Sequence, residues 1–385
     1  MSERIPAVDK TYLLEESKTF CMFPWLHLNV TPKGDIYPCC SNNYTDPFGN
    51  TKETSLKEAF NNDKMKQLRL DMLAGKKNSV CDFCYKHEEA GPHSFRNYSK
   101  EHFGQHFDKL VPHTGADGHV HDFNMHYFDI RFSNICNFKC RTCGSEFSSQ
   151  WGAEMRENHD PKHPILIHAD DQTGTVLEEF IRRGKKPVLR YNTNASQLKY
   201  KKYDILELWK HFDKVEVSCS VDHFGERAEW LRKGTDWGAV ENNLLMFRDL
   251  EQVEFSMNTV FSMFNYPMIG EFYQYLKDKG IVRSEDWYNS LYLAVHPSYY
   301  SAKSLPKELK IKAAENALKF ADKFEGDKTS LSRLIRDAVH FAGEDDTWAD
   351  NKSIMLQHTA SIDNIRDEDF WKVFPELNSI RDLEL

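Results

Sequence analysis

The stretch Cys136-Asn-Phe-Lys-Cys140-Arg-Thr-Cys143 carries three thiols within eight residues. The preceding residues 127–132 (YFDIRF) form a short alternating run with aromatic and aliphatic residues, and this pattern predicts a β-strand. The three thiols therefore lie on a loop directly after a strand. Three thiolates can hold three corners of a cubane iron–sulfur cluster and leave the fourth iron without a protein ligand. A structural zinc ion would require a fourth ligand close by, so the spacing favours a cluster whose open iron binds another molecule.

A second group of cysteines lies near the N-terminus. Residues 26–31 and 35–37 predict two short strands around the turn at 32–34 (PKG), and this hairpin would bring Cys21 near Cys39. A helical pattern over residues 55–75 then leads to the pair Cys81-Asp-Phe-Cys84. Four thiols suit either a second iron–sulfur cluster or a structural zinc ion. The candidate ligands are Cys21, Cys81, Cys84 and one of the adjacent pair Cys39 and Cys40.

The rest of the chain alternates between strand-like and helix-like segments, which predicts an α/β fold with a parallel sheet. Cys219 lies alone in a strand-like run and is expected to be a small buried hydrophobic residue. After the first strand at 127–132, the expected strands are residues 164–169, 187–192, 215–221, 253–260 and 290–295. The expected helices are residues 148–158, 176–183, 205–212, 240–250, 268–279 and a segment from 306 onward.

The spacing of Cys136, Cys140 and Cys143 resembles the radical S-adenosylmethionine superfamily. This resemblance implies a partial (β/α)6 TIM-like barrel, a [4Fe–4S] cluster and S-adenosylmethionine chelated to the open iron. The segment from Gly34 to Cys39, with the pattern G-x₃-P-C, resembles the twitch domain, a relative of the SPASM domain that carries an auxiliary cluster. This resemblance implies that the ligands of the auxiliary cluster are Cys21, Cys39, Cys81 and Cys84, with Cys40 as a spare. Here this domain precedes the barrel, an arrangement similar to a group of uncharacterised twitch-bearing proteins, many of them phage-encoded.

The resemblance also implies a set of cofactor-binding residues at the carboxyl ends of the barrel strands. Hydroxyl, amide and guanidinium groups there could hold the carboxylate and ribose of S-adenosylmethionine. The superfamily places a Gly-Gly-Glu motif after its second strand, and this chain has none. Asp170 and Asp171 would stand at that strand end and could bind the cofactor's amino group, or they could cap the next helix. The predicted cofactor-binding residues are Asn192, Asn194, Ser218, Ser220, Asp222, Arg232 and Asp170.

Length and composition agree with a globular protein of two or three domains. The chain has 385 residues, of which 40% are hydrophobic and 28% charged, with a net charge of −9. We expect no nucleic-acid partner because no basic patch dominates, and no membrane span because no apolar run is long enough. The first twenty residues lack a signal-peptide pattern, so nine cysteines indicate a reducing, cytoplasmic setting. The predicted domains are a twitch-like domain at 1–100, a histidine-rich connector at 101–126, the barrel at 127–300 and a helical extension at 301–385.

The sequence therefore predicts a radical S-adenosylmethionine enzyme with one auxiliary cluster. The expected partners are S-adenosylmethionine, an electron donor and an unknown substrate, for which a peptide or protein is the first guess. The missing Gly-Gly-Glu motif keeps an alternative open, in which a non-catalytic iron–sulfur or zinc protein uses the same barrel as a binding module. A zinc-dependent binding protein without cofactor chemistry is the third possibility.

Overall fold

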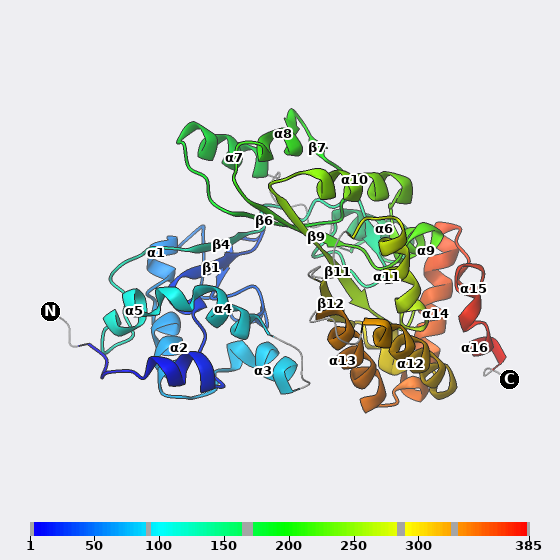
Figure 1. Cartoon of the computed structure of the whole chain (residues 1–385), viewed down its shortest axis with the longest axis horizontal. Coiled ribbons are helices and arrows are strands. Elements are labelled where there is room, and N and C mark those ends of the chain that lie inside the picture. The colour runs from blue at the N-terminus through cyan, green and yellow to red at the C-terminus, as the bar shows by residue number, and fades with distance from the viewer. Residues whose placement is uncertain (1–3, 90–93, 164–171, 283–288, 325–329, 383–385) are drawn as a thin grey trace. The chain divides into compact units, whose positions relative to one another are not determined.

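The computed structural model describes residues 4–89, 94–163, 172–282, 289–324 and 330–382. The chain divides into two compact units, and the boundary in sequence lies between Asn134 and Ile135 (Figure 1). Each cysteine group falls in its own unit. Cys21, Cys39, Cys40, Cys81 and Cys84 belong to the first unit, and Cys136, Cys140, Cys143 and Cys219 belong to the second.

The first unit is built on a four-stranded sheet with the order β3-β2-β1-β4. The predicted hairpin is present, since β1 pairs antiparallel with β2. The strands are β1 (His27–Val30), β2 (Asp35–Tyr37), β3 (Gly49–Asn50) and β4 (Tyr127–Ile130), and the helices are α1 (Leu56–Ala59), α2 (Asp63–Leu73), α3 (Asp82–Glu89), α4 (Phe95–Phe103) and α5 (Phe107–Leu110). Short 3₁₀ turns, including η2 (Phe23–Trp25) and η3 (Ser79–Cys81), connect these elements.

The strand expected to open the barrel belongs to the first unit instead. β4 runs parallel to β1 over four residue pairs, from His27 with Tyr127 to Val30 with Ile130. The two strands share a face on which the rings of His27 and Tyr127 stack 4.6 Å apart. The prediction that this strand joins the parallel sheet of the barrel is therefore wrong. Its short pattern predicts a strand but does not identify the neighbour with which that strand pairs.

The histidine-rich segment at 101–126 is packed into the first unit, whereas the sequence predicted a separate connector. Trp25 donates from Nε1 to Thr114 Oγ1 over 2.8 Å, and the Arg69 guanidinium donates to the carbonyl oxygen of Gly118 over 3.0 Å. The backbone at Gly118 (φ +84°) lies so close to Lys66 that a Cβ there would be 2.4 Å from the Lys66 carbonyl oxygen. These contacts make the segment part of the domain that precedes it.

The second unit contains the predicted parallel sheet. Four strands lie in the order β12-β11-β9-β6, and all three neighbouring pairs are parallel. Their bounds, β6 (Leu189–Thr193), β9 (Val215–Ser220), β11 (Val253–Phe261) and β12 (Asn289–Leu293), match the last four predicted strands to within a few residues. The mixed α/β fold class with a parallel sheet is thereby confirmed. The second predicted strand, at 164–169, lies outside the described residues.

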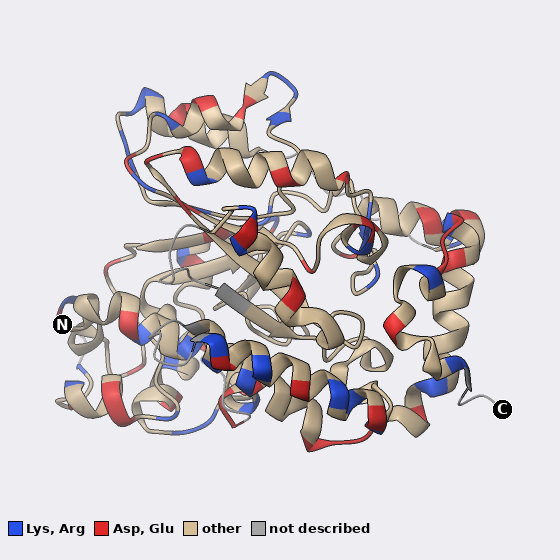
Figure 2. Cartoon of the chain, turned by 45° about the vertical axis from the view of Figure 1, so that its right-hand side comes forward, with Lys and Arg blue, Asp and Glu red and all other residues tan. Residues whose placement is uncertain are grey.

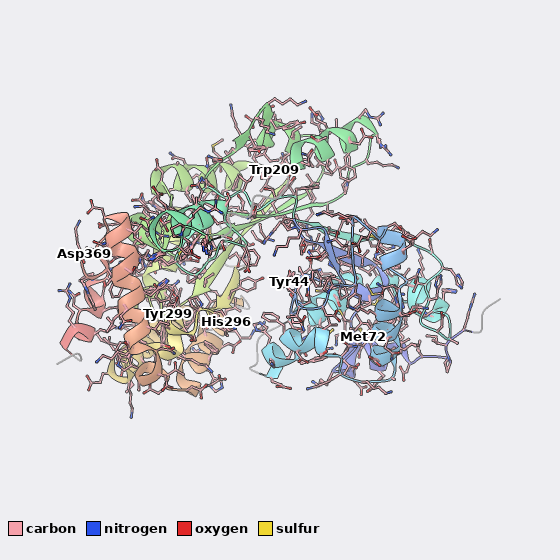
Figure 3. All side chains as sticks on the ribbon, turned by 180° about the vertical axis from the view of Figure 1, so that it is seen from behind. Tyr44, Met72, Trp209, His296, Tyr299 and Asp369 are labelled. Atoms are coloured by element: carbon pink, nitrogen blue, oxygen red, sulfur yellow. The ribbon has the colours of Figure 1, made fainter. Side chains whose placement is uncertain are left out.

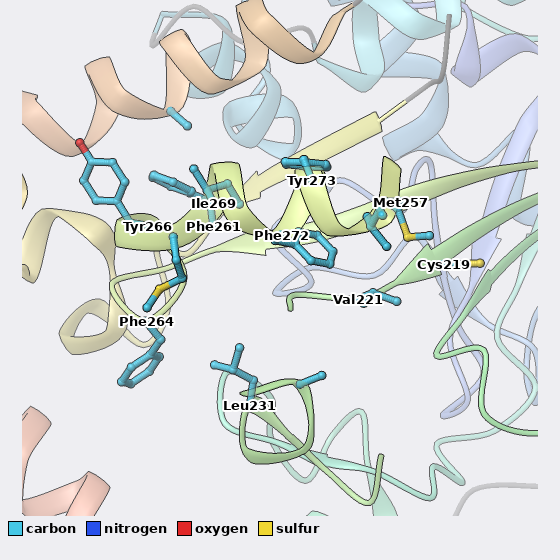
Figure 4. Packing of buried hydrophobic residues seen from close by; sticks show 14 of the residues in the cluster. Cys219, Val221, Leu231, Met257, Phe261, Phe264, Tyr266, Ile269, Phe272 and Tyr273 are labelled. Atoms are coloured by element: carbon cyan, nitrogen blue, oxygen red, sulfur yellow. The ribbon is translucent and has the colours of Figure 1, made fainter. Parts of the chain in front are cut away.

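One face of this sheet is apolar and packs against helices. Val215, Val217 and Cys219 alternate along β9 and are buried. α10 (Trp237–Asp249) and α11 (Ile269–Asp278) contribute Leu244 and Phe272 to the same cluster. Figure 4 shows Cys219, Met257, Phe272 and Tyr273 within this cluster. Cys219 is fully buried, as the sequence predicted, and burial raises the pKa of its thiol above the usual range.

The remaining elements of the second unit are helices and short strand pairs. β5 (Lys139–Cys140) pairs with β10 (Arg232–Lys233), and β7 (Lys199–Tyr200) pairs with β8 (Tyr203–Asp204). The helices before β12 are α6 (Ser149–Asn158), α7 (Thr173–Arg182), α8 (Ile205–Trp209) and α9 (Gly225–Leu231). The C-terminal helices are α12 (Lys307–Ala321), α13 (Ser330–Glu344), α14 (Trp348–Arg366), α15 (Phe370–Val373) and α16 (Ser379–Asp382).

The surface carries charges of both signs. Lys and Arg residues alternate with Asp and Glu residues along the helices in Figure 2. Among the described helices, none combines the length and the apolar character needed to span a bilayer.

The contact between α11 and α12 gives a first prediction. A Cβ added at Gly270 would lie 2.7 Å from Cβ and Cγ of Phe320. Gly270→Ala should therefore lower the free energy of unfolding by about 1–3 kcal/mol through overpacking. Gly343→Ala in α13 is the control, because no atom lies within 4 Å of the added Cβ, and it should be neutral or stabilise by roughly 0.5–1 kcal/mol. Urea unfolding measures both changes. Equal stability of the two variants would contradict the close packing.

Candidate cluster-binding sites

Four thiols of the first unit line a single cavity. Cys21, Cys39, Cys81 and Cys84 surround about 400 Å³ of space free of protein atoms, part of which is open to solvent. Met72 of α2, labelled in Figure 3, and the buried Arg96 also line it. Cys40 does not line this cavity. The structure thus brings together the four predicted ligands and places Cys39, rather than its neighbour, among them.

Local structure explains how these thiols converge. Cys21 lies just before η2, which leads into β1, and Cys39 follows β2, the antiparallel partner of β1. Cys81 ends η3, and Cys84 lies in the first turn of α3. The Asn78 side chain caps η3 by accepting a hydrogen bond from Val80 N over 3.2 Å. The hairpin and the capped turn therefore bring thiols from distant positions in the sequence to one cavity.

The thiols lie close enough to influence one another's ionisation. Burial raises the pKa of Cys21 to about 12, and the nearby Cys84 adds to the shift. Burial likewise raises the pKa of Cys81 and of Cys84 above the usual range. The pKa of Cys39 is raised mainly by a hydrogen bond with Cys40 and, to a smaller extent, by burial. Among the described residues, no three His, Cys, Asp or Glu side chains are close enough to hold a single metal ion.

Arg96 and Ser99 of α4 hold the segment around Cys21. The Arg96 guanidinium donates to the carbonyl oxygens of Ser17 and Phe20 over 2.9 and 3.1 Å. It also forms an ion pair with Glu88 at the end of α3. The Ser99 hydroxyl lies 3.1 Å from Cys21 Sγ and accepts a hydrogen bond from Met22 N over 3.0 Å. One side chain thus ties the backbone before Cys21 to the helix that carries Cys84.

In the second unit, the three-cysteine loop is tightly folded. Cys143 N donates to the carbonyl oxygen of Cys140 over 3.1 Å, and Phe138 N lies 3.5 Å from Cys136 Sγ. Burial raises the pKa of Cys140 to about 12, and Arg232 acts in the opposite direction. Cys143 and Cys136 both lie near enough to add to the shift. The three thiols are therefore neighbours in space as well as in sequence.

Arg232 and Asp222 form an ion pair beside this loop. Nε and Nη2 of Arg232 each donate to one oxygen of Asp222 over 2.8 Å, and Nη1 lies 3.9 Å from Cys140 Sγ. Burial disfavours the charged guanidinium, but Asp222 and then Cys140 raise the pKa of Arg232 above its usual range. Asp222 follows the carboxyl end of β9 and also accepts a hydrogen bond from Val260 N over 2.8 Å. These two predicted residues are thus in contact with each other and with the cysteine loop.

Asn194 links the same loop to the end of β6. Its Nδ2 donates to Asn137 Oδ1 over 2.9 Å, and Asn137 lies next to Cys136. Asn137 in turn donates to Ser196 Oγ over 2.9 Å. The loop therefore lies at the carboxyl ends of both β6 and β9, the end of a parallel sheet where functional residues gather. Neither Asn137 nor Ser196 was predicted, although an amide directly after the first cysteine was a visible signal.

The remaining predicted residues lie on the polar face of the sheet. The register places Asn192 beside Ser218 and Ser218 beside Ser256, and the two serine hydroxyls are 3.2 Å apart. Two residues further along the strand, Ser220 lies beside Asn258. Asp170 and Asp171 lie outside the described residues, so their predicted roles remain predictions.

The two groups of thiols fit the groups that the sequence predicted. Thiolate is the ligand that iron–sulfur clusters require, and each unit gathers its thiols in one place. The first site offers four thiols, one for each iron of a cubane cluster, so that no iron is left without a protein ligand. The second offers three thiols beside a fixed guanidinium, an arrangement in which a further ligand can complete the site.

Residues 21–85 match the family model of SPASM, an iron–sulfur cluster-binding domain. This match confirms the prediction that the segment from Cys21 to Cys84 resembles a SPASM-type domain and supports an iron–sulfur cluster there. No curated protein matches the chain.

Two solved structures with detectable similarity are described as native anSMEcpe with bound AdoMet and Cp18Cys peptide, and native anSMEcpe with bound AdoMet. The first is 18% identical with a TM-score of 0.36, and the match covers 51% of this chain and 60% of that one. The second is 16% identical with a TM-score of 0.35, and the match covers 51% and 61%. The chain thus matches about three fifths of the length of these proteins. Similarity at this level assigns no activity.

The cavity in the first unit predicts which of the two adjacent thiols binds the metal. Cys39→Ala should abolish metal binding at this site, whereas Cys40→Ala should leave it intact, because only Cys39 lines the cavity. Loss of the metal should also destabilise the first unit, since small metal domains fold around their metal. Iron, zinc and sulfide analysis after anaerobic reconstitution measures the outcome. Metal loss in Cys40→Ala alone would show that the ligand assignment is wrong.

Proposed function

We propose that this chain is a radical S-adenosylmethionine enzyme whose cofactor-binding cluster is held by Cys136, Cys140 and Cys143. The observation that carries the proposal is the position of this loop. Its three thiols lie together at the carboxyl ends of β6 and β9, beside the ion pair of Arg232 and Asp222. Three protein thiolates complete three corners of a cubane and leave one iron for S-adenosylmethionine. The four thiols of the first unit would hold the auxiliary cluster.

The chemistry resides in the bound groups, and the protein supplies their placement. When bound, the cluster and S-adenosylmethionine would supply radical chemistry. An external electron donor would drive reductive cleavage of S-adenosylmethionine, and the 5′-deoxyadenosyl radical would abstract hydrogen from a substrate. Asp222 holds the Arg232 guanidinium in place through two hydrogen bonds. The guanidinium thereby presents a fixed positive charge beside the Cys140 sulfur. A guanidinium is also a group that binds a carboxylate well, so Arg232 would suit the carboxylate of the cofactor.

The polar face of the parallel sheet is the best candidate surface for the rest of the cofactor and for the substrate. Ser218, Ser256 and Asn192 lie side by side in one row, and Ser220 and Asn258 lie in the next. Within the part of the chain that the structure describes, Asn258 Oδ1 is buried without a hydrogen-bond partner, so a donor on a bound molecule would satisfy it. Hydroxyl and amide groups suit a substrate rich in polar groups, and the SPASM-type domain favours a peptide or protein.

A non-catalytic role is the second candidate function. Its support is the absence of a Gly-Gly-Glu motif in the sequence, since that motif binds the amino group of S-adenosylmethionine in the superfamily. A protein of this kind would assemble both metal sites but would neither bind nor cleave the cofactor. Cofactor binding therefore separates the two functions.

Replacing the three thiols tests the proposal. The triple variant of Cys136, Cys140 and Cys143 to Ala should lose one cluster and all production of 5′-deoxyadenosine, while the first unit keeps its metal. Iron and sulfide analysis and an assay with dithionite measure these outcomes. Unchanged iron content in the triple variant would rule out the cluster assignment. A wild-type protein that assembles both clusters but does not bind S-adenosylmethionine would favour the non-catalytic function.

Arg232 gives a more specific prediction. Arg232→Lys keeps the charge but loses the two-pronged contact with Asp222. It should weaken binding of S-adenosylmethionine about ten- to a hundredfold, corresponding to about 1.5–3 kcal/mol for hydrogen bonds to a charged group. The control is Arg190→Lys, which alters an ion pair with Glu216 on the same sheet and should bind normally. Equilibrium binding to the reconstituted protein measures both. Equal affinities would remove Arg232 from the cofactor site.

A further inference from the structure

The loop that carries the three cysteines is anchored by side chains far away in the sequence. Arg141 lies between the second and third cysteines, and its side chain is 1% exposed. The guanidinium lies 3.7 Å from the centre of the Trp230 ring. Its Nη2 forms ion pairs with Asp363 and, over 2.5 Å, with Glu368. A residue inside the cysteine motif is thus held by two carboxylates of the C-terminal helical region.

A second buried network anchors the residue before Cys140. Lys139 Nζ lies 2.5 Å from Glu154 Oε1, and the Glu154 side chain is 3% exposed. Arg366, at the end of α14, donates to the same carboxylate over 2.7 Å from Nη2, and over 3.1 and 3.2 Å from Nε. Arg141 therefore contacts Asp363 and Glu368 directly. Lys139 is connected to Arg366 through the Glu154 carboxylate.

Glu368 joins the cysteine loop to the loop of Arg232. One of its oxygens contacts Arg141, and the other lies 2.9 Å from Lys233 Nζ. Lys233 lies beside Lys139 in the pairing of β10 with β5, where Arg232 lies beside Cys140. The Glu368 carboxylate therefore contacts both the residue that follows β5 and a residue of β10. The pairing of these two strands brings the Cys140 sulfur next to the Arg232 guanidinium.

The C-terminal turn is itself rigidly built. α14 ends at Arg366, and the next residue, Asp367, adopts a left-handed conformation with φ +52°. Asp363 accepts hydrogen bonds from Trp230 Nε1 over 3.0 Å and from Phe370 N over 2.6 Å. Asp369, labelled in Figure 3, caps α15 by accepting from Trp371 N over 3.0 Å. The turn can thus present Glu368 in one defined direction.

We propose that residues 363–368 are a positioning element for the three-cysteine loop. They set the loop's geometry through Arg141 and Lys139, and they set the approach of Arg232 to Cys140 through Glu368. These residues touch no reacting group themselves. The inference rests on the proposed function only in assuming that a cluster occupies the three thiols, because the anchoring contacts belong to the protein alone.

The test compares two substitutions in the C-terminal region. Glu368→Gln removes the charge that bridges Arg141 and Lys233. Glu376→Gln is the matched control, since Glu376 forms an ion pair with Arg227 of α9 rather than with either loop. Both variants lose one carboxylate from the same region. Because the Glu376 side chain is more exposed than that of Glu368 (41% against 12%), urea unfolding of both variants measures any difference in general stability.

Two measurements distinguish positioning from general stability. In reconstituted protein, a ferrous chelator should strip iron from the three-cysteine site about tenfold faster in Glu368→Gln, the lower end of the effect of losing a group that orients metal ligands. The triple cysteine variant identifies the contribution of the first unit to iron release, which should not change. In metal-free protein, mass spectrometry should show faster alkylation of Cys140, with unchanged rates at Cys21 and Cys84. Glu376→Gln should show neither effect.

Equal behaviour of Glu368→Gln and Glu376→Gln in both measurements would overturn the inference, as would parallel changes at the two cysteine sites. Arg141→Lys provides a second test because it keeps the charge and loses the planar fork. It should show the same selective change at Cys140. If the wild-type protein takes up no iron at the three-cysteine site, the proposed function fails, and alkylation of the metal-free protein still decides whether residues 363–368 position the loop.

Discussion

The cysteine-bearing segments of this protein depend on buried guanidinium groups. These segments are short turns and two-residue strand pairs, so few backbone hydrogen bonds fix them. A guanidinium carries five donors in a rigid plane and can bind several acceptors from different segments at once. Four arginines act in this way. Arg69 and Arg96 hold the backbone around Cys21, whereas Arg141 and Arg232 hold the three-cysteine loop.

This mode of support suits a site made of thiols. A buried charge needs a partner of opposite charge, and this pairing requirement fixes the positions of both groups. Arg96 meets two backbone carbonyls and Glu88. Arg141 meets Asp363 and Glu368 through Nη2, while its Nε and Nη1 have no hydrogen-bond partner among the described residues. The charged networks therefore define the shape of each loop independently of a metal. The thiols themselves are buried, and their raised pKa values mean that metal binding must displace their protons.

The sequence predicted local chemistry well and long-range pairing poorly. Spacing identified the three-cysteine loop, whereas the first thiol group was predicted from a hairpin, a C-x₂-C pair and the resemblance to the twitch domain. Strand patterns located β6, β9, β11 and β12, since their apolar faces alternate with polar ones. The partner of β4 could not be predicted, because four residues of alternating pattern are compatible with either sheet. The anchoring of Arg141 by Asp363 and Glu368 left no local signal, since charged residues on a helix are usually exposed to solvent.

The two cysteine sites differ in how far apart in the sequence their supporting residues lie. The four thiols of the first unit are all supplied before residue 85, and the side chains that hold them lie before residue 100. The three-cysteine loop begins at Cys136, but the carboxylates that pair with Arg141 come more than two hundred residues later. Until those carboxylates are in place, Arg141 cannot be buried without a large free-energy cost. The first site can therefore assemble from a contiguous stretch of chain, whereas the second acquires its geometry only when the segment from Asp363 to Glu368 has reached Arg141.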